Sequence, residues 1–156
     1  MNYSDSERIA FYFEENNLET ASSIHEADLV IFNTCGVRQM AEDRIYGQIH
    51  NLRKKNPQVK IILTGCLANR KDVQRRLKNK VDFFADIKNI ANILPELGLK
   101  QKEYPRDYLS IPGKHKNNFQ ARVPIMTGCN NFCSYCIVPY ARGKENSRPA
   151  EEIIEE

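Results

Sequence analysis

The segment Asp28-Leu-Val-Ile-Phe-Asn-Thr-Cys-Gly36 decides the fold class of this chain. Its first six residues form a short apolar run with β-branched and aromatic side chains, as in a buried strand of a parallel sheet. A second run, Val59-Lys-Ile-Ile-Leu-Thr64, has the same character, and Gly65-Cys66 follows it directly. The two segments therefore predict two buried strands, each ending next to a cysteine.

Helical periodicity fills the segments around these strands. The clearest helix is expected over residues 38–55, where Ile45, Ile49 and Leu52 fall on one face. The capping-box pattern Ser4-x-x-Glu7 predicts a helix near residues 5–16 at the start of the chain. Further elements are expected as a helix over 70–78, a strand over 81–85 and a short helix over 89–94. This alternation predicts an α/β domain over residues 1–97, with a doubly wound parallel sheet.

Composition sets the broad class of the chain. The 156 residues are 41% hydrophobic and 28% charged, which is typical of a globular protein with one domain, or with one domain and part of another. No apolar run approaches the length of a membrane span, and the polar N-terminus is unlike a signal peptide, so we expect no membrane and a cytoplasmic location. The net charge of +3 is compatible with RNA binding and does not establish it.

Cys35 and Cys66 occupy equivalent places, because each follows an expected strand and precedes an expected helix. Ligands of open parallel sheets bind beyond the carboxyl ends of the strands. Two thiols brought to the same edge can therefore meet there. The alternative is that each is an inert core cysteine, which is the commoner state of a single buried cysteine.

The C-terminal part of the chain has a different organisation. Residues 98–118 lack apolar periodicity and are expected to form a linker. A strand is expected over 122–127, and a helix begins at Pro149. Between them Cys129, Cys133 and Cys136 lie at C-x3-C-x2-C spacing.

Three close thiols on one loop suit a cubane iron–sulfur cluster, which normally takes four thiolates. Three ligands would leave one iron open to a small chelating molecule. Zinc is an alternative, but a structural zinc site needs four ligands and no histidine or further cysteine lies nearby in sequence. A disulfide with one spare thiol is the other alternative, and nothing in the sequence suggests secretion.

The segment Cys129-x3-Cys133-x-Tyr135-Cys136 resembles the signature of the radical S-adenosylmethionine (SAM) enzymes. The tail Ile137-Val-Pro-Tyr-Ala-Arg-Gly-Lys-Glu-Asn-Ser-Arg148 narrows the resemblance to the methylthiotransferases. It implies that residues 119–156 are the first strand, the cluster loop and the helix start of a radical SAM (β/α) barrel. Cys129, Cys133 and Cys136 would hold a 4Fe-4S cluster with SAM on its open iron.

The resemblance extends to the first domain. Asn33-Thr34-Cys35 and Thr64-Gly65-Cys66-Leu67-Ala68 resemble two segments that hold a second, auxiliary 4Fe-4S cluster in this family. The family's first strand and third ligand would lie upstream of Met1. The resemblance therefore implies a chain truncated at both ends, with Cys35 and Cys66 as two of three auxiliary ligands.

The implied activity is that of a tRNA-modifying enzyme. Its SAM would be cleaved to a 5′-deoxyadenosyl radical, with an electron from a donor such as flavodoxin, and a methylthio group would be added to N6-isopentenyl-adenosine beside the anticodon. Sister branches act on threonylcarbamoyl-adenosine in tRNA or on a ribosomal-protein aspartate. The alternative for this chain by itself is a non-catalytic, cluster-binding fragment of such an enzyme.

Several further residues have two interpretations each. The resemblance implies that Tyr135 packs near the SAM adenine, and the alternative is core packing. Arg142 and Arg148 would contact SAM or a substrate phosphate, and the alternative is solvated loop arginines. The basic residues of segment 75–80 could contact tRNA, or form a solvated helix face.

Overall fold

The computed structural model describes residues 2–100, 108–113 and 119–156. The chain divides into two compact units. One consists of Met1–Thr20 together with Ile87–Glu156, and the other of Ala21–Asp86. The units meet after Thr20 and after Asp86, whereas the predicted domain boundaries lie at residues 97 and 118. The domain boundaries remain a prediction.

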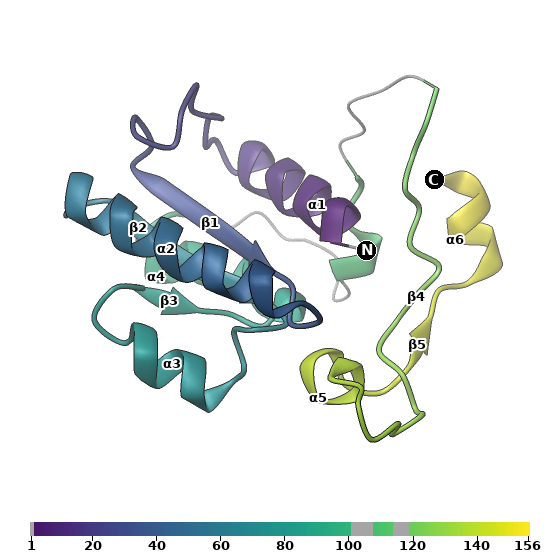
Figure 1. Cartoon of the computed structure of the whole chain (residues 1–156). Helices are drawn as coiled ribbons and strands as arrows, with labels where there is room; N and C mark the ends of the chain where they lie inside the picture. Colours follow the sequence, from purple (N-terminus) through teal and green to yellow (C-terminus); the bar gives the residue numbers. More distant parts are fainter. Residues whose placement is uncertain (1, 101–107, 114–118) are drawn as a thin grey trace. The chain divides into compact units, whose positions relative to one another are not determined.

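A three-stranded parallel sheet forms the centre of the Ala21–Asp86 unit (Figure 1). Its strands are β1 (Leu29–Thr34), β2 (Lys60–Gly65) and β3 (Phe83–Phe84), in the order β1-β2-β3. β1 and β2 pair in register from Leu29 opposite Lys60 to Thr34 opposite Gly65. The prediction of an α/β fold with a parallel sheet is confirmed.

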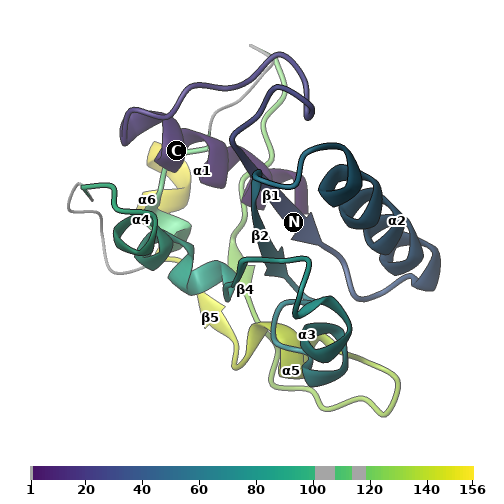
Figure 2. The ribbon, with the colours of Figure 1, turned by 90° about the vertical axis from the view of Figure 1, so that its left-hand side faces the viewer.

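The two helices of this unit connect successive strands. α2 (Gln39–Lys55) joins β1 to β2, and α3 (Lys71–Leu77) joins β2 to β3. Figure 2 shows both helices on the same side of β1 and β2. One buried cluster joins alternate strand residues to both helices, namely Phe32, Ile49, Leu52, Val59, Ile61, Leu63, Leu67, Val73, Leu77 and Val81. A doubly wound sheet also needs a helix on the opposite face, so that part of the fold remains a prediction.

β3 is shorter than the predicted strand over residues 81–85. Its pairing nevertheless continues at both ends, because the Asp82 amide donates to Ile61 O at 2.9 Å and the Ala85 amide to Leu63 O at 3.0 Å. The Asp82 carboxylate also accepts from the Ile61 amide at 2.8 Å and from Arg53 at 2.7 Å. Burial raises the pKa of Asp82, but the Ile61 amide and Arg53 outweigh it and leave the pKa below its usual value.

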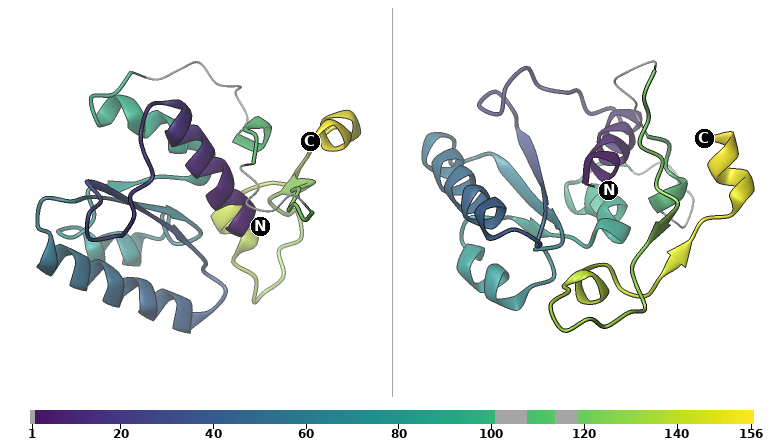
Figure 3. Two further views of the ribbon diagram at one scale, coloured as in Figure 1. Left: turned by 90° about the horizontal axis from the view of Figure 1, so that it is seen from above. Right: turned by 45° about the vertical axis from the view of Figure 1, so that its right-hand side comes forward.

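The other unit combines the first helix with the C-terminal segments. It contains α1 (Asn2–Glu15), the 3₁₀ helix η1 (Ile87–Asn92), α4 (Ile93–Glu96), η2 (Tyr108–Ser110), β4 (Met126–Thr127), α5 (Val138–Arg142), β5 (Asn146–Ser147) and α6 (Ala150–Glu155). α1 packs against η1, where Tyr12 Oη donates to Ala91 O at 3.4 Å. Figure 3 gives two further views of these elements.

The predicted helix over 89–94 is found as η1 followed by α4. Pro95 is tolerated because it lies in the first turn of α4, where its missing amide has no helical partner to lose. The strand predicted over 122–127 is found only as the two residues of β4. β5 offers β4 only two partners, and Pro124 has no amide to donate. The helix predicted at Pro149 is confirmed as α6.

The predicted linker over 98–118 is only partly visible, because residues 101–107 and 114–118 lie outside the described residues. Within the described part, Tyr108, Leu109 and Ile111 are buried, so this part of the segment is packed. In the described parts of the chain, no helix has the length and apolar composition to cross a membrane.

Candidate metal centre

The three-cysteine loop is closed at its base by a short antiparallel ladder. β4 and β5 pair Met126 with Ser147 and Thr127 with Asn146, and residues 128–145 form the loop between them. The Asn130 side chain ties the loop together by accepting from the Glu145 amide at 3.1 Å. The ladder therefore holds the first cysteine close to the end of the loop.

Gly128 and Gly143 make this closure possible. Both have φ near +76°, a conformation that favours glycine. A Cβ added at Gly128 would lie 2.0 Å from Lys144 O and 2.7 Å from Gly143 O. The Cys129 amide donates to Gly143 O at 3.1 Å, so the backbone approaches itself directly beside the first thiol.

The loop cysteines are all free, with Cys133 exposed and Cys129 and Cys136 half-buried. Backbone groups order the loop around them. The Asn131 amide donates to Cys129 Sγ at 3.4 Å, and the Cys136 amide donates to Cys133 O at 3.0 Å.

This donor set fits an iron–sulfur cluster, because free thiols are its usual ligands and none of the three is buried. Among the described residues, no group of three or more histidine, cysteine, aspartate or glutamate side chains has an arrangement that could hold a metal ion. Cluster binding at this loop would therefore require the three thiols to turn toward a common centre. Their role as ligands remains a prediction.

Tyr135 is 90% exposed, so the alternative that it packs in a core is wrong. Its position beside SAM remains a prediction. Phe132 and Tyr140 are 68% and 70% exposed, and their rings meet edge to face with centroids 5.9 Å apart. These two rings were not expected from the motif, although their proximity in sequence to Cys133 and Cys136 could have indicated them. The cysteine loop thus carries an exposed aromatic surface.

Arg142 is not a solvated arginine. Its side chain is only 7% exposed and donates to Asp5 Oδ2 at 2.6 Å, and Asp5 on α1 is fully buried. Tyr108 Oη donates to Asp5 Oδ1 at 3.1 Å. Burial, followed by the Asp5 charge, raises the pKa of Tyr108 well above its usual value. The pair anchors the end of α5 to α1, while the predicted contact of Arg142 with SAM remains untested.

Arg148 is also held by the protein. Its side chain is 5% exposed and donates to Pro124 O at 2.9 Å, and it forms ion pairs with Glu152 and Glu156. Glu156 also pairs with Arg8 at 2.6 Å. Burial raises the pKa of Glu156, but Arg8 and Arg148 outweigh it and leave the pKa lowered. The solvated alternative is therefore wrong for Arg148 as well.

Cys35 and Cys66 follow the last paired residues of β1 and β2, as the sequence predicted. Thr34 lies opposite Gly65, and the Cys66 amide donates to Thr34 O at 3.1 Å. A Cβ added at Gly36 would lie 3.2 Å from the Cys66 Cβ, so the two strand ends are in close contact. Cys66 is buried, Cys35 is half-buried and both are free. The prediction that both reach one sheet edge is confirmed, and their ligand role remains a prediction.

Comparison with known proteins gives consistent matches. A family model described as "Uncharacterized protein family UPF0004" matches residues 1–103. The chain is 42% identical to a tRNA-2-methylthio-N(6)-dimethylallyladenosine synthase of Syntrophomonas wolfei, over the whole chain and 38% of that relative. Relatives with the same name from Lachnoclostridium phytofermentans and Dictyoglomus thermophilum are 41% and 40% identical, again over the whole chain and 38% and 39% of their lengths.

These names confirm the resemblance to methylthiotransferases predicted from the cysteine loop. The chain spans between a third and two fifths of the length of the curated relatives it matches. The family model covers two thirds of the chain, including β1, β2 and both strand-end cysteines. The chain belongs to the UPF0004 family.

Proposed function

We propose that the whole protein is a radical SAM tRNA methylthiotransferase that adds a methylthio group to N6-dimethylallyl-adenosine (isopentenyl-adenosine) in tRNA. The observation that carries the proposal is the set of three free thiols on one tightly closed loop. The names of relatives that match the whole chain at 40–42% identity support it. The same names favour this substrate over threonylcarbamoyl-adenosine or a ribosomal-protein aspartate.

Each residue has a stated part in this proposal. Cys129, Cys133 and Cys136 hold one 4Fe-4S cluster, and Cys35 and Cys66 contribute to the auxiliary cluster. When bound, the loop cluster and SAM supply radical chemistry that can remove hydrogen from an unactivated carbon. Gly128 and Gly143 close the loop, and the exposed ring of Tyr135 is available to stack on the SAM adenine. The ion pair between Asp5 and Arg142 holds the end of α5 against α1.

The remaining parts of the proposal concern the rest of the protein. β4, the cysteine loop and α6 would be the first elements of a (β/α) barrel. The chain spans 38–39% of the lengths of these relatives, which leaves room in them for the other strands of a barrel. A small redox protein such as flavodoxin would supply the electron. A tRNA substrate, and thiols that must stay reduced to bind iron, support a cytoplasmic location for the protein.

Anaerobic iron–sulfur reconstitution of the chain should give bound iron that depends on the loop cysteines. About four irons per chain should be lost in the Cys129→Ala/Cys133→Ala/Cys136→Ala variant, because the loop supplies the cluster's thiolates. The Cys35→Ala/Cys66→Ala variant is the matched control and should keep those irons. A wild-type chain that binds no iron while all its thiols are reduced would refute the loop cluster.

The substrate assignment is tested on the whole protein with SAM, a reductant and tRNA that carries N6-dimethylallyl-adenosine. Mass spectrometry of the digested nucleosides should show the methylthio product, and the triple cysteine variant should form none. tRNA carrying threonylcarbamoyl-adenosine is the matched control substrate. A product on that tRNA alone would assign the protein to the sister branch.

A further inference from the structure

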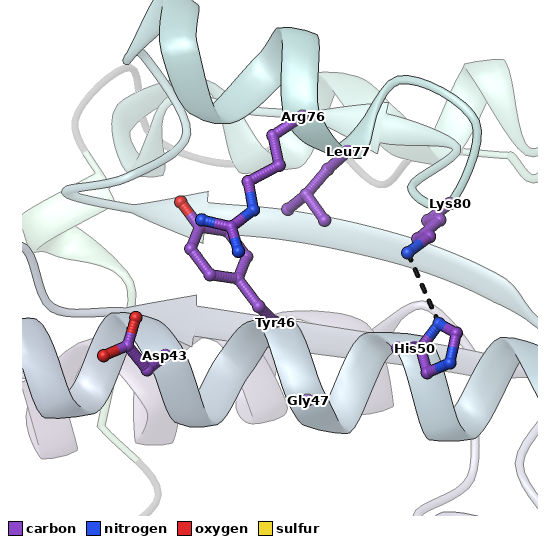
Figure 4. Close-up of a pocket in the computed structure, with 7 residues that line it drawn as sticks. All are labelled: Asp43, Tyr46, Gly47, His50, Arg76, Leu77 and Lys80. Carbon is purple, nitrogen blue, oxygen red and sulfur yellow. Dashed lines mark hydrogen bonds between the residues drawn. The ribbon is translucent and has the colours of Figure 1, made fainter.

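A pocket of about 370 Å³ lies between α2 and α3 in the Ala21–Asp86 unit (Figure 4). The side chains that give it its chemistry are Asp43, Tyr46 and His50 on α2, with Arg76 on α3 and Lys80 just after it. All of its lining residues lie in one compact unit, and none of them is a cysteine. The pocket therefore needs an explanation of its own.

Arg76 is held by an aromatic ring. Its guanidinium lies over the Tyr46 ring, 3.9 Å from the centroid, and the phenol of Tyr46 donates to Glu42 Oε1 at 2.5 Å. Burial and the Glu42 hydrogen bond raise the pKa of Tyr46 to about 12, so the phenol stays neutral near pH 7. Stacking leaves the in-plane N–H groups of a guanidinium available to a ligand.

Lys80 and His50 form a second group of donors. Lys80 Nζ lies 3.3 Å from His50 Nδ1. A lysine ammonium can only donate, and a histidine ring that accepts at Nδ1 has its other nitrogen available to donate to a ligand. Figure 4 shows this pair at one end of the pocket and the Arg76–Tyr46 stack at the other. The pocket thus offers hydrogen-bond donors from Arg76, Lys80 and His50.

These cations are not neutralised by carboxylates in the way that neighbouring arginines are. Arg53 pairs with Asp82 at 2.7 Å, and Arg70 pairs with Glu42 at 2.6 Å. Over residues 2–100, 108–113 and 119–156, the ion pairs include neither Arg76 nor Lys80. The one acid that lines the pocket, Asp43, accepts from Gln39 at 3.1 Å. Two formal positive charges therefore face one negative charge.

We propose that this pocket binds a backbone phosphate of RNA, and that, if the proposed function holds, the RNA is the tRNA substrate. Arginine, lysine and histidine N–H groups are the usual donors to phosphate oxygens. Exposed lysines also follow the pocket residues along α2, at Lys54 and Lys55 in its last turn. A polyanion gains from such flanking charges along its length, whereas a free nucleotide gains from the pocket alone.

The test measures binding of an anticodon stem-loop RNA to the whole 156-residue chain by fluorescence anisotropy at several salt concentrations. The Arg76→Gln/Lys80→Gln variant should bind about 10–100-fold more weakly, since two charge-assisted contacts are lost. The slope of log K against log salt should fall by about one to two. Circular dichroism checks that this variant is folded.

The matched control is Arg75→Gln/Lys78→Gln, which removes the same charge from exposed positions that do not line the pocket. A loss of affinity in the control as large as in the pocket variant would overturn the proposal in favour of a diffuse basic face. Competition with inorganic phosphate and with AMP tells an RNA backbone phosphate from a free phosphate or nucleotide as the ligand of the pocket. Tight AMP binding that depends on Arg76 and Lys80, with unchanged RNA affinity in the pocket variant, would also overturn it.

This experiment needs neither iron nor catalysis, so its outcome is independent of the methylthiotransferase proposal. RNA binding through the pocket without any methylthio product would leave the pocket assignment standing and remove the proposed function. If the whole protein forms the methylthio product but RNA affinity is unchanged in the pocket variant, the proposed function stands and the pocket assignment is removed.

Discussion

Replacing Asp5 by alanine should lower the free energy of unfolding by about 3–5 kcal/mol, because it leaves the guanidinium of Arg142 buried without its carboxylate. Asp5 is fully buried, Arg142 is 7% exposed, and their atoms are 2.6 Å apart. The loss also removes the acceptor of the Tyr108 hydroxyl. Urea unfolding followed by circular dichroism measures the change, and hydrogen exchange at the Ala141 amide localises it to α5.

Two variants test this explanation. Glu151→Ala removes an exposed acid from α6 and should change stability by less than about 0.5 kcal/mol. Asp5→Ala combined with Arg142→Met removes both charges and should recover a large part of the loss, since no unpaired charge remains. If the double variant instead costs the sum of both single substitutions, the buried pair is not the cause.

Substituting alanine for Gly65 should destabilise the sheet by more than about 2 kcal/mol, through strain at positive φ and a direct backbone clash. Gly65 has φ +83°, and an added Cβ would lie 2.4 Å from Thr34 O. Relief of the clash must separate the ends of β1 and β2, so the buried thiol of Cys66 should also react faster with a thiol reagent.

Gly47→Ala is the matched control for that substitution. Gly47 lies within α2, and an added Cβ there meets nothing within 4 Å. Alanine should therefore stabilise the chain by about 0.5–1 kcal/mol through helix propensity. A Gly65→Ala variant as stable as the wild type, with Cys66 still protected, would contradict the close approach of the two strand ends.

The sequence predicted best where a strong local pattern coincides with burial. β1, β2 and α2 lie within a residue or so of their expected ranges, because their apolar side chains form the core themselves. The placement of Cys35 and Cys66 at one edge followed from the rule that parallel strands end together. α5 was not predicted, because its five residues are too few to show a helical periodicity and one of them is Pro139, which a helix tolerates in its first turn.

The partners of the arginine and lysine side chains could not be predicted from local sequence patterns. Arg142 was expected to contact a ligand or solvent, but its partner Asp5 is 137 positions away and gives no local signal. Arg76 and Lys80 looked like part of a charged helix face. Only the packing of α3 beside α2 distinguishes them from Arg75 and Lys78, because it brings Arg76 over Tyr46 and Lys80 to His50.

The division of the chain into units fixes an order of events during synthesis. Once the ribosome has delivered residue 86, every strand and helix of the Ala21–Asp86 unit is present, and its pairings join residues close in the chain. α1 is made earlier but completes its unit later, because Asp5 must wait for Arg142. Short loops close at lower entropic cost than long ones. The carboxylate of Asp5, on the first helix to be synthesised, is thus among the last groups to reach its native partner.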